Sequence, residues 1–427
     1  MTISDLHQLF ANSEGICTDT RVLKKNQMFF AIKGDNFDGN SFAIKAIELG
    51  ASHAVVDELS LSQKPNIIYV KDVLQTLQDL SRFHRQQFNI PVIGITGSNG
   101  KTTSKELLNA VLVEKFKVLY TEGNLNNHLG VPFTLLRMDS SHEIAIIEMG
   151  ANKPGDIKEL ADIALPTHGI ITNIGKAHIE GFGGLDGVIK TKTELYQNIS
   201  ISEGELFVNV DDEILIDKVP DGPRIIPYGK TSNNIDGEIH EANPFITFSW
   251  KKNDYQSPLI KSNLVGAYNL TNYLLAVCVG DYFGVDHHQI NRGISNYQPT
   301  NNRSQVTKTN RNTLIVDCYN ANPSSMKSAI QSFNAITAKD KLMILGDMLE
   351  LGHIQDKEHQ AIIDNSLAES LDTIFVGVIF KKMKPHSKCF ETVEEMISKM
   401  DLNSIKEKTI LLKGSRGIRL EKLIDLL

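Results

Sequence analysis

Short apolar runs recur along the chain, and stretches with the periodicity of amphipathic helices separate them. In the middle of the chain, residues 92–96, 143–150 and 168–175 form such runs, and residues 105–115 carry apolar side chains at helical spacing. Runs of this kind are typical of parallel strands that are covered on both faces by crossover helices. The pattern therefore predicts an α/β region built on a mostly parallel sheet.

The same alternation is found on either side of this region. Near the start of the chain, residues 28–33 and 66–70 predict strands, and residues 42–51 predict a helix that ends at Gly50. Further on, four apolar runs predict the strands of a smaller doubly wound region, at residues 313–320, 341–348, 372–378 and 408–415.

Two polar stretches divide the chain, residues 81–91, which read as a connector, and residues 296–305. A chain of 427 residues is also longer than one typical domain. We therefore expect three domains of the α/β class: a small N-terminal α/β domain, a central domain with a mostly parallel sheet and a C-terminal Rossmann-like domain. Their predicted ranges are residues 1–85, 86–299 and 300–427.

Composition limits the classes of function. The net charge of −7 argues against an unaided nucleic-acid binder, whose affinity would come from a basic surface. No apolar run approaches the roughly 18 residues that a membrane helix needs, and residues 1–10 lack the regions of a signal peptide. The four cysteines lie far apart without a CxxC pair. We expect a monomeric, cytoplasmic protein that neither enters a membrane nor binds nucleic acid.

The stretch GITGSNGKTTSKEL, residues 94–107, follows an apolar run and leads into a helical pattern. Its glycines allow a tight turn that presents N–H groups to phosphate oxygens at the start of a helix. Ile95 lies where the common phosphate-loop motif has glycine, so this stretch matches the motif only at its GKT end. The alternative to a phosphate loop is a plain glycine turn between a strand and a helix. We expect Lys101 to contact the outer phosphates and the Thr102 hydroxyl to hold Mg²⁺. The predicted phosphate-binding residues are Gly97, Ser98, Asn99, Gly100, Lys101, Thr102 and Thr103.

Two further polar residues follow predicted strands. Glu148 lies near the end of one apolar run, where phosphate-loop enzymes place an acid that meets the metal; the alternative is a glutamate at the surface. His178 lies in a loop just after another run, a position suited to a ligand or a metal, although a surface histidine has the same pattern.

Lys192 lies within the apolar stripe of a predicted helix, four residues after Val188 and three before Leu195. Burial lowers the pKa of a lysine, and a neutral amine can react with CO₂ to give a carbamate, an oxygen ligand for Mg²⁺. The alternative is a lysine whose stem packs while its ammonium group reaches water. Spacing alone favours this alternative.

Several motifs, taken in order, resemble the Mur ligase family. They include TGSNGKTT, GNLNNHLGVP, IIEMGANKPGDI, TNIGKAHIEGFG, KTELY, NVDD, DCYNANPSSM, ILGDMLELG and LLKGSRG. Together they span nearly the whole chain, and their order is more specific than any one of them. The resemblance implies a domain that receives a UDP-sugar, a central P-loop-type ATPase and a mobile C-terminal lobe.

The resemblance also implies roles for individual residues. Thr102 and Glu148 would hold one Mg²⁺, and His178 with a carbamylated Lys192 would serve a second. The implied catalytic residues are Lys101, Glu148, His178 and Lys192. Further implied contacts are Asn272 with adenine; Arg303, Asp317 and Asn320 with the nucleotide; Asn126 and Asn127 with the acceptor; Thr20, Arg21, Asp38 and Gly39 with the nucleotide-sugar; and Ser415 with a dipeptide. The family usually has serine where Thr20 lies, and Thr20 keeps the hydroxyl. The family usually has histidine at Asn40 and Tyr268, so the substrate and nucleotide contacts near these two positions are expected to differ.

The activity implied by the resemblance is an ATP-dependent ligation that joins D-alanyl-D-alanine to UDP-N-acetylmuramoyl-tripeptide through an acyl phosphate in peptidoglycan synthesis. Another ATP-dependent amino-acid ligase of the Mur and folylpolyglutamate superfamily is the alternative. A nucleotide-binding switch without catalysis would be expected to lack the metal ligands, yet the four residues implied to hold metal are all present.

Overall fold

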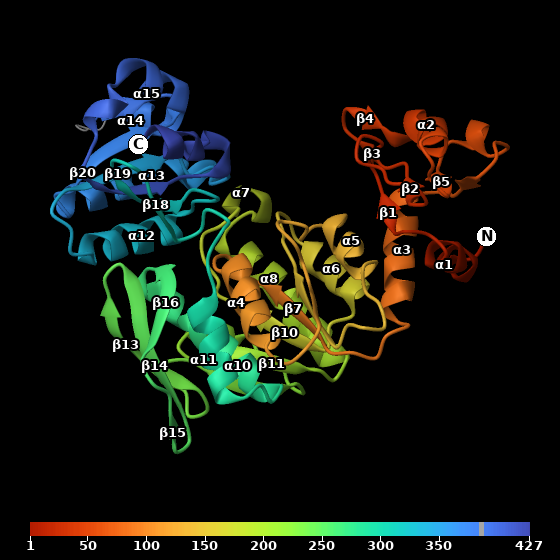
Figure 1. Cartoon of the computed structure of the whole chain (residues 1–427), viewed down its shortest axis with the longest axis horizontal. Coiled ribbons are helices and arrows are strands. Elements are labelled where there is room, and N and C mark those ends of the chain that lie inside the picture. The colour runs from red at the N-terminus through yellow and green to blue at the C-terminus, as the bar shows by residue number, and fades with distance from the viewer. Residues whose placement is uncertain (384–387) are drawn as a thin grey trace.

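Three predominantly parallel sheets follow one another along the chain in the computed structural model, which describes residues 1–383 and 388–427 (Figure 1). The first sheet has the order β1-β2-β5-β6, with parallel neighbours throughout. The elements of this part are the helices α1 (Ile3–Ala11), α2 (Ala43–Glu48) and α3 (Val73–Arg85), and the strands β1 (Ile16–Cys17), β2 (Met28–Phe30), β3 (Lys33–Gly34), β4 (Phe37–Asp38), β5 (His53–Val56) and β6 (Ile67–Tyr69).

The prediction of a connector at residues 81–91 is wrong for its first half. Helix α3 continues to Arg85, and its polar residues Ser81, His84 and Arg85 are buried. The His84 ring is 2.8 Å from the carbonyl oxygen of Met138, and the Arg85 guanidinium donates to the carbonyl oxygen of Phe88 at 2.5 Å. Because these side chains find hydrogen-bond partners, a polar stretch can pack as a helix.

The second sheet has six parallel strands in the order β12-β11-β10-β7-β9-β8. The apolar runs predicted as buried strands in this region are β7, β9 and β10, and every residue of β7 and β9 is buried. The strands are β7 (Val92–Thr96), β8 (Val118–Tyr120), β9 (Ile144–Glu148), β10 (His168–Ile171), β11 (Glu205–Asn209) and β12 (Arg224–Tyr228). The helices are α4 (Lys101–Leu112), α5 (Gly130–Leu135), α6 (Asp156–Ala164), α7 (Ile179–Phe182), α8 (Leu185–Ile201), α9 (Glu213–Asp217), α10 (Leu270–Tyr282) and α11 (His287–Asn296).

An antiparallel sheet, which the sequence did not predict, follows within the central part. Its strand β14 pairs with β13, β15 and β16. Trp250 of β14 is fully buried and donates its indole N–H to the side-chain oxygen of Asn291 at 2.8 Å. Apolar and polar residues alternate from Ile246 to Lys251, which is the signal of a strand with one apolar face, and the polar Thr247 and Ser249 are buried as well. The strands are β13 (Asp236–Ala242), β14 (Phe245–Lys252), β15 (Tyr255–Gln256) and β16 (Ile260–Val265).

The third sheet has the order β17-β18-β22-β19-β20-β21, and only β17 is antiparallel to its neighbour among these described strands. The four predicted runs form β18, β19, β20 and β22, so the doubly wound arrangement is confirmed. The strands are β17 (Gln305–Lys308), β18 (Thr313–Asp317), β19 (Lys341–Gly346), β20 (Asp372–Val376), β21 (Lys388–Phe390) and β22 (Thr409–Lys413). The helices are α12 (Pro323–Ala335), α13 (Gln355–Ala368), α14 (Val378–Met383) and α15 (Val393–Lys399).

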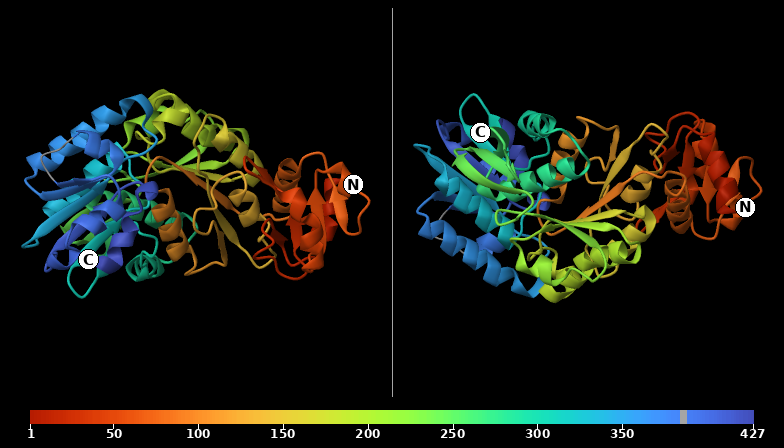
Figure 2. Two further views of the ribbon diagram at one scale, coloured as in Figure 1. Left: turned by 90° about the horizontal axis from the view of Figure 1, so that it is seen from above. Right: turned by 90° about the horizontal axis from the view of Figure 1, so that it is seen from below.

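The molecule is elongated, with the N-terminal part at one end and the C-terminal sheet at the other (Figure 2). The C-terminal part lies over the central sheet on the side that carries α4 and α7 (Figure 1). Segments that follow the carboxyl ends of β7, β9, β10 and β18 line a shared cavity, which is where open parallel sheets usually bind ligands. No helix in the described ranges is both long and apolar enough to span a membrane.

Candidate active site

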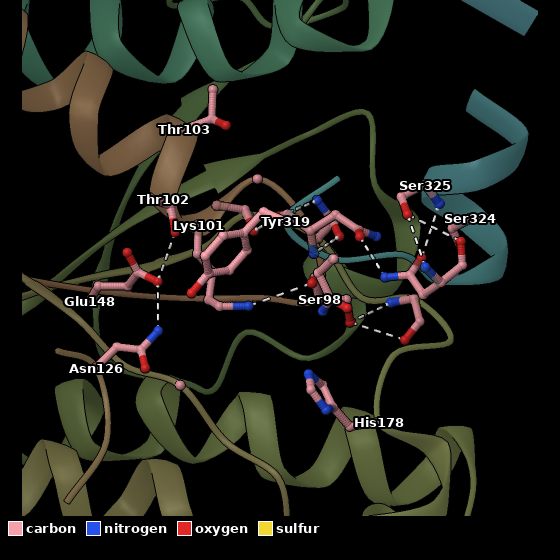
Figure 3. Close-up of a pocket in the computed structure, with 18 of the residues that line it drawn as sticks. Ser98, Lys101, Thr102, Thr103, Asn126, Glu148, His178, Tyr319, Ser324 and Ser325 are labelled. Carbon is pink, nitrogen blue, oxygen red and sulfur yellow. Dashed lines mark hydrogen bonds between the residues drawn. The ribbon is translucent and has the colours of Figure 1, made fainter. Parts of the chain in front are cut away.

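A cavity of about 790 Å³ lies between the central and C-terminal parts. Its lining includes Ser98 to Thr103, Glu148 and His178 from the central part, and Arg303 and Tyr319 from beyond residue 300. Figure 3 shows Lys101, Glu148, His178 and Tyr319 in this cavity. Predicted site residues from two separate sheets therefore meet in one space.

The glycine turn after β7 has the backbone that a phosphate loop requires. Gly97 has φ +142°, and a Cβ there would lie 2.0 Å from the Thr172 hydroxyl oxygen. Gly100, at φ +77°, immediately precedes α4. The Thr172 hydroxyl donates to the carbonyl oxygen of Asn99 at 2.6 Å and so fixes the loop against β10. The start of α4 then directs free N–H groups and the positive end of the helix dipole into the cavity.

Lys101 is folded back onto this loop, where its ammonium group donates to the carbonyl oxygen of Gly97 at 2.6 Å. Burial lowers the pKa of Lys101 to about 8; the nearby Glu148 carboxylate opposes this change, whereas the positive charge of Arg303 adds to it. An anion in the cavity would favour the charged form of Lys101.

Glu148 ends β9 and is 1% exposed. Its Oε1 accepts hydrogen bonds from the Thr102 hydroxyl at 3.1 Å and from the Asn126 side chain at 2.8 Å. Its Oε2 is buried without a hydrogen-bond partner among the described residues and lies 3.7 Å from the ammonium group of Lys105. Lys105 was not identified from the sequence, because its only signal was a charged residue within the apolar pattern of a helix.

The pair formed by Thr102 and Glu148 fits a hard divalent cation. Both offer oxygen atoms, which Mg²⁺ prefers, and Oε2 of Glu148 is a buried acceptor without a hydrogen bond. The described residues contain no group of three or more His, Cys, Asp or Glu side chains that could hold a metal. A cation here would therefore need further oxygen ligands from a bound molecule or from water, as is usual for Mg²⁺.

Lys192 of α8 is 2% exposed, and burial lowers its pKa well below the ordinary value, with repulsion from Lys101 adding to the effect. The alternative prediction, in which the Lys192 stem packs while its ammonium group reaches water, is therefore wrong. Lys192 is absent from the cavity lining, and its Nζ lies 5.5 Å from the centroid of the Phe182 ring. His178, whose ring lies 6.4 Å from that of Phe182, does line the cavity. Phe182 thus neighbours both predicted ligands of the second metal.

Three contacts join loops of the central part to the C-terminal part. His178 Nδ1 lies 2.5 Å from Oε2 of Glu350. The Lys176 ammonium group donates to Oε1 of Glu358 at 2.7 Å. The side chain of Asn322 donates to Oδ1 of Asn99, within the phosphate loop, at 2.7 Å. The C-terminal part is therefore held against the loops that line the cavity.

The remaining predicted nucleotide contacts also lie in the cavity. Asn272 of α10 accepts from the Ser104 hydroxyl at 3.1 Å, which fixes it beside α4. Asp317, at the end of β18, accepts from the ammonium group of Lys413 at 2.6 Å. The same lining includes the predicted nucleotide contacts Arg303 and Asn320. It also includes the predicted acceptor contacts Asn126 and Asn127.

Besides Lys192, six predicted residues lie outside this lining: Gly97, Thr20, Arg21, Asp38, Gly39 and Ser415. The Ser415 hydroxyl accepts from the backbone N–H of Leu349 at 3.0 Å and is buried. In the N-terminal part, the side chain of Asn40 donates to Asp38 and to Asp57, both at 2.8 Å. Asn40 is thus used to hold a turn rather than exposed to a ligand.

Family models and curated relatives match nearly the whole chain. The Mur ligase middle domain matches residues 95–280, the Mur ligase, glutamate ligase domain matches residues 302–416, and the Mur ligase family, catalytic domain matches residues 12–88. UDP-N-acetylmuramoyl-tripeptide–D-alanyl-D-alanine ligase of Bacillus subtilis is 33% identical over 429 residues, covering 96% of this chain and 92% of the relative.

Two solved structures extend the likeness to the fold. MurF from Acinetobacter baumannii has a TM-score of 0.89 at 29% identity, covering 99% of this chain and 97% of its own. MurF ligase from Thermotoga maritima in complex with ADP has a TM-score of 0.85 at 25% identity, covering 98% and 97%.

Proposed function

Because this chain belongs to the Mur ligase family, we propose that it is the ATP-dependent ligase that joins D-alanyl-D-alanine to UDP-N-acetylmuramoyl-tripeptide in peptidoglycan synthesis. The family predicted from the sequence motifs is thereby confirmed. One observation carries the proposal: the phosphate loop, the carboxylate of Glu148 and residues beyond position 300 line a single cavity. The curated relative that bears this activity in its name covers almost the whole chain.

The nucleotide is proposed to bind with its phosphates on the loop from Gly97 to Thr103. Loop N–H groups and Lys101 would neutralise phosphate charge, and Asn272, which lines the same cavity, is proposed to contact the adenine base. The T. maritima structure, described as a complex with ADP, supports the choice of an adenine nucleotide.

Thr102 and Glu148 would hold a Mg²⁺ ion, which would supply positive charge beside the phosphates and favour their transfer. A second Mg²⁺ is proposed near His178 and Lys192. The buried amine of Lys192, with its lowered pKa, has the chemistry that carbamate formation requires, since only the neutral amine adds to CO₂. Carbamylation would replace a buried cation by an anion.

The acceptor is proposed to extend from the phosphate loop past Asn126 and Asn127, which line the cavity beside Glu148. Its UDP group would then be received by the N-terminal part around Arg21 and Asp38, and Ser415 would lie near the incoming dipeptide. We further propose that the enzyme is a cytoplasmic monomer. The free state of all four cysteines fits a reducing compartment.

The reaction is proposed to begin with transfer of the terminal phosphoryl group of ATP to the tripeptide carboxylate, which gives an acyl phosphate and ADP. The dipeptide amine then attacks the acyl carbon, and phosphate leaves. The chain contributes charge neutralisation and positioning, so that two anions can meet, rather than a nucleophile of its own. The C-terminal part lies against the site through Asn322 and Glu358, and would keep water from the acyl phosphate.

A phosphate-release assay tests this function. UDP-N-acetylmuramoyl-tripeptide, ATP and Mg²⁺ are combined with D-alanyl-D-alanine, glutamate or a diamino acid, using acceptors that end in lysine or in diaminopimelate. We expect release with D-alanyl-D-alanine and a product heavier by that dipeptide. Release with another amine would instead favour a different ligase of the superfamily, and nucleotide binding without turnover would favour a non-catalytic switch.

A further inference from the structure

The guanidinium group of Arg303 is held by an aromatic ring. Its Cζ lies 3.9 Å from the centroid of the Tyr319 ring. The Nε atom of Arg303 is buried and has no hydrogen-bond partner in the part of the chain that the structure describes. The face of Tyr319 is therefore the contact that sets where this cation lies, since arginine stacks on aromatic faces with a preferred planar geometry.

The backbone around Arg303 is fixed as well. Asn302 and Ser304 have φ +55° and +49°, values that side-chain-bearing residues adopt only when their surroundings hold them there. The Ser304 hydroxyl lies 2.9 Å from the hydroxyl of Tyr268. The backbone carbonyl oxygen of Ser304 accepts from the N–H of Val265 at 3.4 Å. Arg303 is thus anchored to the central part through its neighbour Ser304, whereas its side chain stacks on Tyr319, in the loop that follows β18 of the C-terminal sheet.

Tyr319 lies in the loop that follows β18, at the carboxyl edge of that sheet. It lies two residues after Asp317, the last residue of β18, whose carboxylate accepts from Lys413 at the end of the adjacent β22. The guanidinium group of Arg416 lies 5.4 Å from the same ring centroid. The ring can therefore hold Arg303 only while the carboxyl edge of the C-terminal sheet lies at the cavity.

The charge in the cavity indicates what Arg303 is held for. Arg303, Tyr319 and Lys101 all line it, and Figure 3 shows Tyr319 in the same site as Lys101. Burial is the main cause of the lowered pKa of Lys101, and repulsion from the Arg303 cation lowers it further. Two cations that repel each other across a cavity are both stabilised by an anion placed between them.

We propose that Tyr319 is a positioning residue for nucleotide binding: its ring holds the Arg303 guanidinium against the phosphate groups of ATP and so connects the C-terminal sheet to the phosphate loop. This role rests on the proposed function, because it needs a nucleotide on the loop. The hydroxyl of Tyr319 has no part in it.

The test measures binding of adenylyl imidodiphosphate, a non-hydrolysable ATP analogue, to the full-length protein by calorimetry in the presence of Mg²⁺. Tyr319→Leu removes the ring, and Tyr319→Phe, the matched control, removes the hydroxyl alone. We expect Tyr319→Leu to raise the dissociation constant by about threefold to thirtyfold, the range that a cation–π contact supports, and Tyr319→Phe to remain within about twofold of wild type. In the Arg303→Ala background, Tyr319→Leu should have no further effect.

This double-mutant comparison separates positioning from a structural role, which would weaken binding in both backgrounds. Arg303→Lys, which keeps the charge without a planar group to stack, should weaken binding in the wild-type background and provides a second measurement if Tyr319→Leu folds poorly. Equal binding by wild type and Tyr319→Leu, or the same loss with and without Arg303, would overturn the role of Tyr319 alone. A wild-type protein that binds no analogue would overturn the proposed function together with this role.

Discussion

Replacement of Lys105 by methionine removes a fully buried positive charge and leaves the volume of the side chain almost unchanged. In the native protein, its ammonium group donates to the carbonyl oxygen of Thr121 at 2.6 Å and lies 3.0 Å from Oε1 of Glu106 and 3.7 Å from Oε2 of Glu148. Lys105 itself has no exposed surface, and Glu148 is 1% exposed. Methionine would leave two carboxylates and a carbonyl group without their shared cation.

The size of the effect follows from burial. Removal of one partner of a buried ion pair typically costs about 3–5 kcal/mol, because the remaining charge stays out of water. An unsatisfied carbonyl group such as that of Thr121 adds about 1–3 kcal/mol when nothing replaces its donor. These two costs overlap, because both come from the loss of the same ammonium group, so we expect the free energy of unfolding of the central part to fall by about 3–5 kcal/mol.

Urea denaturation followed by tryptophan fluorescence measures this change, because Trp250 is the single tryptophan and lies buried in the central part. Lys115→Met is a matched control. Lys115 also donates to two carbonyl groups, of Phe283 at 3.0 Å and Gly284 at 2.8 Å, but it is exposed, so its loss should cost less than about 1.5 kcal/mol. If Lys105→Met cost no more than Lys115→Met, the account of a charge-balanced buried cluster would be refuted.

Lys192 and Gly130 give three further predictions. Lys192→Ala should lower turnover by more than about 100-fold, with partial recovery in acetate or formate, and full activity without added carboxylate would contradict the carbamate role. Because burial lowers the native pKa of Lys192 below its value of 10.5 in the unfolded chain, the unfolded chain binds more protons between these values. The unfolding free energy of wild type, measured in urea, should therefore rise with pH relative to Lys192→Met, by up to about 1.4 kcal/mol per pH unit, and parallel curves would exclude a shifted pKa. Gly130→Ala should lower stability by about 1–3 kcal/mol in the same assay, since its Cβ would lie 2.3 Å from the backbone of Leu125, whereas Gly34→Ala, which meets open space, should be nearly neutral.

The features predicted correctly from the sequence are those that local pattern encodes. The buried strands β7 and β9 are continuous apolar runs, and the glycine turn between β7 and α4 needs particular residues because Gly97 and Gly100 have positive φ. The burial of Lys192 could be suspected from its place in an apolar stripe, although spacing alone favoured the opposite outcome. Local pattern says which side of a helix faces the core, but it does not say whether a long side chain can reach water.

The features that were missed depend on contacts between distant segments. β14 is an exception, because the alternation of apolar and polar residues from Ile246 to Lys251 is a local signal of a strand. The partners of Lys105 become visible only when β9 is placed beside α4. The stacking of Arg303 on Tyr319 likewise depends on where residues 296–305 lie relative to β18, which the sequence alone does not show. Each of these contacts is set by tertiary packing, for which a single sequence carries no periodic signal.

The division of the site between two sheets has a consequence for the order of events. Most contacts that hold the loop from Gly97 to Thr103 and Glu148 come from the central part, and Asn322 adds one contact from the C-terminal part to Asn99. Asn322 and Tyr319 reach the loop region only because the C-terminal sheet lies over it. We therefore expect that nucleotide can bind first to the central part. The contacts from the C-terminal part add affinity only in the closed arrangement, which is where protection of an acyl phosphate from water is needed.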